Sequence, residues 1–337
     1  MGMPYYAPLQ GLHGGKRTLV LLDNMPSKQL YTSFWTSLAS AGYELDFKTP
    51  SSPAWNLKKY GEYLYDNVVI FAPKADDFGK TTFKDLLAFV DDGGNVLMAA
   101  DDRASESTRA FAESSGVRLD ASGTKVVDHF ASNSNTDRDM SHASVLLGAP
   151  AVSANVLGEG VGNVLYKGIS MRMAASNELT TGVLAGNPTS YVSDATASSG
   201  MLSDTIGSNM VLVAAVQARN NARMTISGSL KLFSNEYILE EGCDNANFAL
   251  RLAKWTFGAN HVLRFRDIQH SQEDGTPPDV ILHEKERPDL PQSLYPDPEI
   301  TRNSLVYRIK DRITYSMVVE ELTDEGWAPF LPDDMQM

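Results

Sequence analysis

The sequence is poor in cysteine, in positive charge and in long apolar runs, and each shortage excludes a class of protein. Its one cysteine, Cys243, cannot form an internal disulfide or a cysteine-based metal cage. Lysines and arginines number 29 against 42 aspartates and glutamates, which opposes nucleic-acid binding because phosphate recognition needs a basic surface. The longest aliphatic run, Met210 to Val216, falls far short of the roughly 20 residues of a membrane-spanning helix.

Targeting and modification signals are equally scarce. The first residues, Met1 to Tyr6, lack the charged and apolar regions of a signal peptide. The sequence Asn187-Pro188-Thr189 contains the proline that blocks N-glycosylation. We therefore expect either a cytosolic protein or a fragment without its targeting and anchoring segments.

The remaining composition, 42% apolar and 21% charged, is typical of a globular protein, and the length suggests about two domains. Apolar runs rich in β-branched residues alternate with segments of helical spacing, such as Phe83 to Val90. The alternation predicts an α/β domain with a mostly parallel sheet and helices on both faces. Strands are expected at 17–22, 43–47, 67–71, 96–100 and 125–127, and helices at 27–41, 83–90 and 105–114.

The composition changes twice further along the chain. Residues 131–200 are rich in serine, alanine, asparagine and glycine and predict only short strands, near 144–147 and 164–166. Residues 270–298 contain six prolines and many acids, which is typical of a stiff, solvated linker. The expected parts are a disordered or artificial leader over 1–16, an α/β domain over 17–266, a proline-rich acidic linker over 267–303 and an incomplete β-sandwich-type domain over 304–337.

Four polar residues that follow predicted strands should meet at one edge of the sheet: Asp23, Asn24, Asp101 and Asp102. Because ligands of open parallel sheets bind beyond the carboxyl ends of the strands, these carboxylates could hold Mg²⁺ or supply a base. Asp and Asn also commonly cap helices and end strands, and this structural alternative is the stronger one. The first turn lacks a glycine-rich phosphate loop, which weakens a nucleotide or flavin interpretation. Because the structural alternative is the stronger one, we expect no cofactor and no bound metal.

Three tyrosines, Tyr60, Tyr63 and Tyr65, lie just before the strand predicted at 67–71. Tyrosines at this density can hold a loop on the core, stack on sugars or anchor a protein interface. The sequence therefore marks them as structural or interface candidates.

A second polar segment, residues 217–223, links two apolar runs and carries Arg219, Asn220 and Arg223. Its two adjacent asparagines suit a tight hairpin turn, because asparagine tolerates a positive φ. The two arginines could instead form a clamp for a carboxylate or phosphate. A hairpin is the expected role, with the clamp as the alternative.

Nucleophilic chemistry finds little support in the sequence. Cys243 lies among acids in segment 240–244 with no strand directly before it, and negative neighbours raise the pKa of a thiol. His129 follows Asp128 at the end of a predicted strand, and the pair is either an oriented base or a structural hydrogen-bonding group. We expect no amidotransferase chemistry.

Several long motifs, in order along the chain, carry a family resemblance: Thr18 to Asp23, Lys59 to Asn67, Asp91 to Leu97, Val126 to His129, Gln217 to Arg223 with Ser227 to Leu230, and Tyr307 to Leu322 with Trp327 to Phe330. With these motifs the chain resembles the non-catalytic, single-pass subunit of the eukaryotic oligosaccharyltransferase, of the wheat-germ-agglutinin-binding-protein type. The segment 267–305 is longer and more acidic than in that family, and 131–200 matches weakly.

The resemblance implies a flavodoxin-like or amidotransferase-like domain followed by the start of an all-β domain. It implies a luminal fragment of an endoplasmic reticulum protein that is membrane-anchored at full length and has no catalytic activity or cofactor of its own. Its partners would be the other subunits, including the multi-spanning catalytic subunit, and its role would be a scaffold in N-linked glycosylation. The alternative is a stand-alone, metal-assisted hydrolase that uses Asp23, Asp101 and Asp102.

Overall fold

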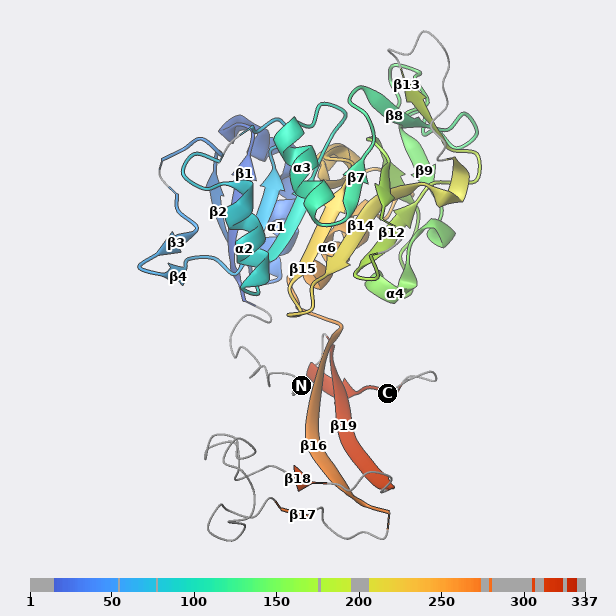
Figure 1. Ribbon diagram of the computed structural model, residues 1–337. Helices are drawn as coiled ribbons and strands as arrows, with labels where there is room; N and C mark the ends of the chain where they lie inside the picture. Colours follow the sequence, from blue (N-terminus) through green and yellow to red (C-terminus); the bar gives the residue numbers. More distant parts are fainter. Residues whose placement is uncertain are drawn as a thin grey trace. The chain divides into compact units, whose positions relative to one another are not determined.

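The computed structural model describes residues 15–53, 55–76, 78–174, 177–194, 206–273, 279–280, 305–306, 312–323 and 326–331. The chain divides into two compact units, one that ends at His261 and one that begins at Val262 (Figure 1). Most of the expected leader and of the expected linker lies outside the described residues.

A nine-stranded sheet forms the centre of the first unit, and eight of its strands follow the order β2-β1-β5-β6-β15-β14-β11-β7. Parallel pairing joins β2 (Glu44–Lys48), β1 (Arg17–Leu22), β5 (Asn67–Phe71), β6 (Asn95–Ala99) and β15 (Arg223–Ser227). Antiparallel pairing adds β14 (Val211–Gln217), β11 (Met171–Met173), β7 (Val117–Leu119) and β12 (Thr180–Ala185). The α/β fold class expected from the sequence is confirmed.

Helices cover both faces of this sheet (Figure 1). Alternate residues of β1 point to opposite faces, so that Val20 and Leu22 join one apolar core and Leu19 and Leu21 join the other. The first core includes α1 (Thr32–Ser40) and α6 (Asn245–Thr256), and the second includes α2 (Phe83–Asp91) and α3 (Glu106–Ser114). Strands buried on both faces are nearly all apolar, which is why the sequence shows continuous runs here.

The prediction of a helix over 27–41 is wrong at its N-terminal end. The segment begins as a 3-10 helix, η1 (Met25–Tyr31), and only then continues as α1. Asn24 is the N-cap, because its side-chain Oδ1 accepts a hydrogen bond from the backbone N–H of Ser27 at 3.0 Å. Pro26 occupies the first turn, where its missing N–H costs nothing.

Smaller elements complete the first unit. The short strands expected near 144–147 and 164–166 are confirmed as a pair, whereas β11, β12 and β13 were not expected. The pairs are β9 (Val145–Leu147) with β10 (Val164–Tyr166), β8 (Thr124–Val127) with β13 (Tyr191–Asp194), and β3 (Lys58–Lys59) with β4 (Glu62–Tyr63). Short helices are η2 (Ala149–Ala151), α4 (Ala154–Leu157), η3 (Gly207–Asn209), η4 (Lys231–Phe233) and α5 (Asn235–Ile238).

The second unit consists of antiparallel strands. Its three-stranded sheet joins β16 (Val262–Gln272), β19 (Ile313–Thr323) and β20 (Gly326–Pro329), and a separate pair joins β17 (Asp279–Val280) to β18 (Leu305–Val306). Glu320 of β19 accepts hydrogen bonds from Arg264 at 2.7 Å and Arg266 at 3.0 Å on β16. Within the described ranges, no helix combines the length and the apolar character needed to cross a membrane.

Candidate functional site

A cleft of about 610 Å³ opens where the parallel strands of the first unit end. The connection after β1 leads to β2 on one side, and the chain then returns to β5 on the other side. Such a reversal of strand order is the usual place for a ligand in an open α/β sheet. The segment after β1 lines this cleft, but the residues directly after β5 do not. The lining residues come from η1, from the turn after β6 and from the segments around Lys125, Gly168 and α5.

Of the four polar residues expected at this edge, Asp101 and Asp102 line the cleft and Asp23 and Asn24 do not. Asn24 caps η1. Burial raises the pKa of the Asp23 carboxyl, and the negative charge of Asp101 raises it further, while Lys74 lowers it. Asp23 and Asp101 are therefore close enough for their charges to interact.

Tyr31 is a buried residue at this edge of the sheet. Burial, with the nearby charges of Asp23 and Asp101, raises the pKa of the Tyr31 hydroxyl to about 12, so it is neutral at physiological pH. Its ring packs against Phe71, with 5.2 Å between ring centroids. Tyr31 thus belongs to the core beneath the cleft and is no ready proton donor.

The carboxylates do not assemble into a metal site. In the part of the chain that the structure describes, no group of three His, Cys, Asp or Glu side chains could hold a metal ion. Asp101 accepts a hydrogen bond from the backbone N–H of Arg103 at 2.8 Å, and Asp102 faces Arg103 and Lys125 at 3.8 and 4.0 Å. This arrangement therefore does not support the hypothesis of a metal-assisted hydrolase.

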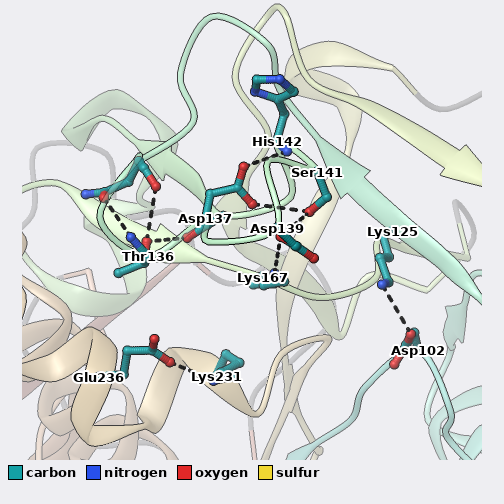
Figure 2. Close-up of polar contacts among 12 residues, drawn as sticks. Asp102, Lys125, Thr136, Asp137, Asp139, Ser141, His142, Lys167, Lys231 and Glu236 are labelled. Carbon is teal, nitrogen blue, oxygen red and sulfur yellow. Dashed lines mark hydrogen bonds and ion pairs between the residues drawn. The ribbon is translucent and has the colours of Figure 1, made fainter.

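Lysines around the cleft are paired with carboxylates (Figure 2). The pairs are Lys125–Asp102 at 4.0 Å, Lys167–Asp139 at 3.4 Å and Lys231–Glu236 at 2.7 Å. Exposed pairs of this kind contribute at most about 1 kcal/mol each. The residues that line the cleft include neither histidine nor cysteine, so they supply no nucleophile with an adjacent imidazole base.

The three tyrosines occupy different environments. Tyr60 lies at the tip of the β3–β4 hairpin and is 95% exposed. Tyr63 packs its ring edge-on against Phe89, and its hydroxyl donates to Asp92 at 2.6 Å. The Tyr65 hydroxyl donates to Asp46 at 2.7 Å. Tyr63 and Tyr65 therefore hold the loop on the core, whereas Tyr60 does not.

The segment 217–223 forms the expected hairpin between β14 and β15. Asn221 has a φ of 67°, the left-handed conformation that asparagine tolerates. The Asn220 side chain donates to the carbonyls of Val90 and Asp91 at 2.8 and 2.7 Å. Asn220 thereby satisfies carbonyls at the C-terminal end of α2, which have no partner within the helix.

The two arginines of this hairpin differ in burial. Arg223 is 3% exposed and donates to the carbonyls of Trp255 and Asn260 at 2.8 Å and of His261 at 2.5 Å. Arg219, in contrast, is exposed at the turn. Both arginines line a second cleft, of about 550 Å³, but the Arg223 guanidinium is directed at three backbone carbonyls. Arg223 is therefore engaged by the fold and does not form one half of a free clamp.

The Asp128 carboxylate is a buried hydrogen-bond acceptor that joins segments distant in the sequence. It is fully buried and accepts hydrogen bonds from Phe130 and Ala131 and from the hydroxyls of Thr189 and Ser190. The side chain of the adjacent His129 contacts a different group, with its Nε2 2.8 Å from the hydroxyl of Tyr191. The sequence alternative of a base oriented by Asp128 is wrong, because this carboxylate is already occupied.

Comparison with known proteins decides the family. The model of the family described as "OST48, N-terminal domain" matches residues 10–259, which include nearly all of the first unit. The chain belongs to the OST48 family. This result confirms the resemblance carried by the sequence motifs.

Relatives in the OST48 family extend the similarity over nearly the whole chain. Each is named as the 48 kDa subunit of the dolichyl-diphosphooligosaccharide–protein glycosyltransferase. The Danio rerio protein is 32% identical over 349 residues, which covers 98% of this chain and 72% of the relative. The Drosophila melanogaster protein is 32% identical over 95% of this chain and 70% of its own length, and the Arabidopsis thaliana protein is 31% identical over 96% and 71%.

Two solved structures have a distant likeness to this OST48 family member. A ThuA-like protein of Parabacteroides merdae is 17% identical, with a TM-score of 0.40 over 72% of this chain and 90% of that chain. A ThuA-like protein of Bacteroides uniformis is 11% identical, with a TM-score of 0.40 over 76% and 95%.

Proposed function

We propose that this protein is a non-catalytic, luminal scaffold subunit of the oligosaccharyltransferase, which supports transfer of lipid-linked oligosaccharide to asparagine. The proposal rests on the contrast between the names of the relatives and the residues that line the cleft. The relatives are named as subunits of a glycosyltransferase, yet the cleft at the usual ligand edge has neither a histidine nor a cysteine among its lining residues. A subunit of this kind contributes to the complex by contact.

The use of the conspicuous polar residues supports the same proposal. Asn24 caps η1, Asn220 caps α2 and Arg223 satisfies three carbonyls near the end of the first unit. Each of these side chains has its hydrogen-bonding capacity directed at the chain's own backbone. These three side chains stabilise the fold, which supports a structural role for them.

The proposal extends to location, partners and domains. The full-length protein would be anchored in the endoplasmic reticulum membrane with this segment in the lumen, beside the multi-spanning catalytic subunit and other subunits. Residues 17–266 would form the α/β domain and 304–337 the start of a β domain, with 267–303 as a linker. The compact first unit ends at His261, shortly before the proposed boundary, and β16, which pairs with β19, already belongs to the second unit.

Affinity purification from microsomes tests the proposal. Tagged full-length protein, solubilised in mild detergent, should co-purify with the catalytic subunit in a complex that glycosylates an acceptor peptide. The same protein purified alone should show no transfer. Recovery of the full-length protein without the catalytic subunit, or transfer by the protein alone, would contradict the proposal.

Replacement of the one cysteine should leave glycosylation unchanged. Burial raises the pKa of the Cys243 thiol, and the neighbouring charge of Glu240 raises it further, so little thiolate is present at neutral pH. Cells that express only the Cys243→Ser protein should glycosylate a reporter at the wild-type level. Reduced glycosylation at an unchanged protein level would show that the thiol takes part.

A further inference from the structure

The β3–β4 hairpin exposes an aromatic side chain in an unfavourable backbone conformation. Tyr60 has a φ of 55° and is followed by Gly61 with a φ of 90°. A residue with a Cβ atom in this left-handed region costs roughly 1–2 kcal/mol, and asparagine or glycine is the usual choice there. Because the Tyr60 side chain is 95% exposed, burial in this chain does not offset that cost. The fold alone gives no reason for a tyrosine at this position.

The base of the same hairpin is firmly held. The Asp92 carboxylate accepts hydrogen bonds from the Tyr63 hydroxyl at 2.6 Å and from Lys58 at 3.1 Å. Lys58 also lies over the Tyr63 ring, 4.1 Å from its centroid, and that ring packs on Phe89 of α2. A projecting side chain on such a base loses little freedom when it binds, which favours affinity. Figure 1 shows the hairpin projecting from the side of the α/β unit.

We propose that Tyr60 is an interface anchor that inserts into an apolar socket on another oligosaccharyltransferase subunit, a socket whose rim carries carboxylates. The inference rests on the proposed function and names a contact for it. Exposed aromatic anchors that become buried are the residues that commonly dominate binding energy at protein interfaces. The tyrosine ring supplies the apolar area and its hydroxyl supplies a polar edge.

The charges beside Tyr60 indicate the chemistry of the socket. Lys58 is paired with the Asp92 carboxylate at 3.1 Å, so Lys59 is the cation at the tip, with Glu62 opposite it on the next strand. Lys59 lies over the Tyr60 ring at 5.5 Å and is exposed. Complementary carboxylates on the partner would steer association and select the orientation.

A lipid surface fits the hairpin less well than a protein socket. The residues on either side of Tyr60 are Lys59 and Gly61, so the tip offers one isolated ring. Membrane binding by amphipathic segments scales with buried apolar area and needs several apolar side chains. A single rigid ring instead matches a pocket of its own shape.

The test compares Tyr60→Asn and Tyr60→Phe in the full-length protein in microsomes, and also in the 337-residue chain. Asparagine tolerates the left-handed conformation, so the melting temperature of the chain should stay equal or rise. The catalytic subunit that co-purifies with Tyr60→Asn should fall by about tenfold or more, as expected for loss of an anchor residue. Tyr60→Phe keeps the ring and should retain most of the assembly.

Each other result overturns the inference. Wild-type recovery of the catalytic subunit by Tyr60→Asn would show that the ring makes no important contact, while a lowered melting temperature would assign Tyr60 to the fold. Tyr60-dependent binding of the chain to anionic vesicles would favour a lipid, and Tyr60-dependent self-association would favour a second copy. Failure of the wild-type protein itself to co-purify would reject the proposed function, which is a separate result.

Discussion

Replacing Arg223 with alanine should lower the melting temperature of the 337-residue chain by about 10 °C. The guanidinium is buried and donates to three backbone carbonyls, of Trp255, Asn260 and His261. It also lies over the Trp255 ring, 4.6 Å from the centroid. A buried carbonyl left without a partner costs about 1–3 kcal/mol, but Asn260 and His261 are only half-buried and water can replace part of their bonding. A total loss of roughly 3–5 kcal/mol is therefore expected. Differential scanning calorimetry measures the change.

Arg219→Ala is the matched control for this prediction. Arg219 lies in the same hairpin, four positions earlier, but its side chain is exposed. Surface substitutions of this kind usually change the free energy of unfolding by less than about 0.5 kcal/mol. Arg223→Lys should fall between the two, because one ammonium group cannot reproduce the fork of donors that reaches three carbonyls. Equal melting temperatures for Arg219→Ala and Arg223→Ala would disprove the assigned role of Arg223.

The parallel half of the sheet is the part of the fold that the sequence predicts best. Strands β1, β5 and β6 are buried on both faces, and such strands appear as continuous apolar runs that need no tertiary information. Strands β11 and β12 have mixed exposure and are short or interrupted by glycine, so local pattern does not distinguish them from loops. The β12–β14 pairing also contains register shifts, which no sequence pattern specifies.

The candidate residues show a similar limit. Tyr60 and Tyr63 have the same side chain in one short segment, yet one is exposed at a turn and the other packs on α2. The turn consists of Tyr60 and Gly61, between the paired residues Lys59 and Glu62. It lacks the Asn-Gly or Asp-Gly pair that usually marks a two-residue hairpin. Arg219 and Arg223 also have the same side chain, but Arg223 begins strand β15 whereas Arg219 lies in the turn before it. The residue types marked these tyrosines and arginines as candidates. Which of them is buried depends on how the backbone orients each side chain, and the sequence does not show this.

Asp128 was missed as a structural centre because its partners are distant in sequence. The carboxylate accepts hydrogen bonds from Thr189 at 2.7 Å and Ser190 at 2.9 Å, about 60 positions further along. The signal that could have found it is an acid at the end of strand β8, opposite the turn that leads into β13. Without the pairing of these two strands, the adjacent His129 was the more conspicuous partner.

Asp128→Asn should destabilise the first unit by about 2–4 kcal/mol at neutral pH, because the amide group places N–H donors against other donors. Burial alone would raise the pKa of the Asp128 carboxyl, but hydrogen bonds from Thr189, Phe130, Ser190 and Ala131 outweigh it and lower this pKa below the usual value. A carboxyl with a lowered pKa in the folded state stabilises the fold above its unfolded pKa of about 3.9. That contribution is lost as the pH falls through the lowered folded-state pKa.

The difference in unfolding free energy between wild type and Asp128→Asn should therefore be largest at neutral pH and shrink below about pH 4. Urea denaturation at a series of pH values measures it, and a difference that stays constant with pH would contradict the assignment. Asp139→Asn is the control carboxyl. Hydrogen bonding from Ser141 and the charge of Lys167 lower the pKa of Asp139 to about 2, yet its side chain is 58% exposed. Solvent and salt screen such a group, so its replacement should change stability little at physiological ionic strength.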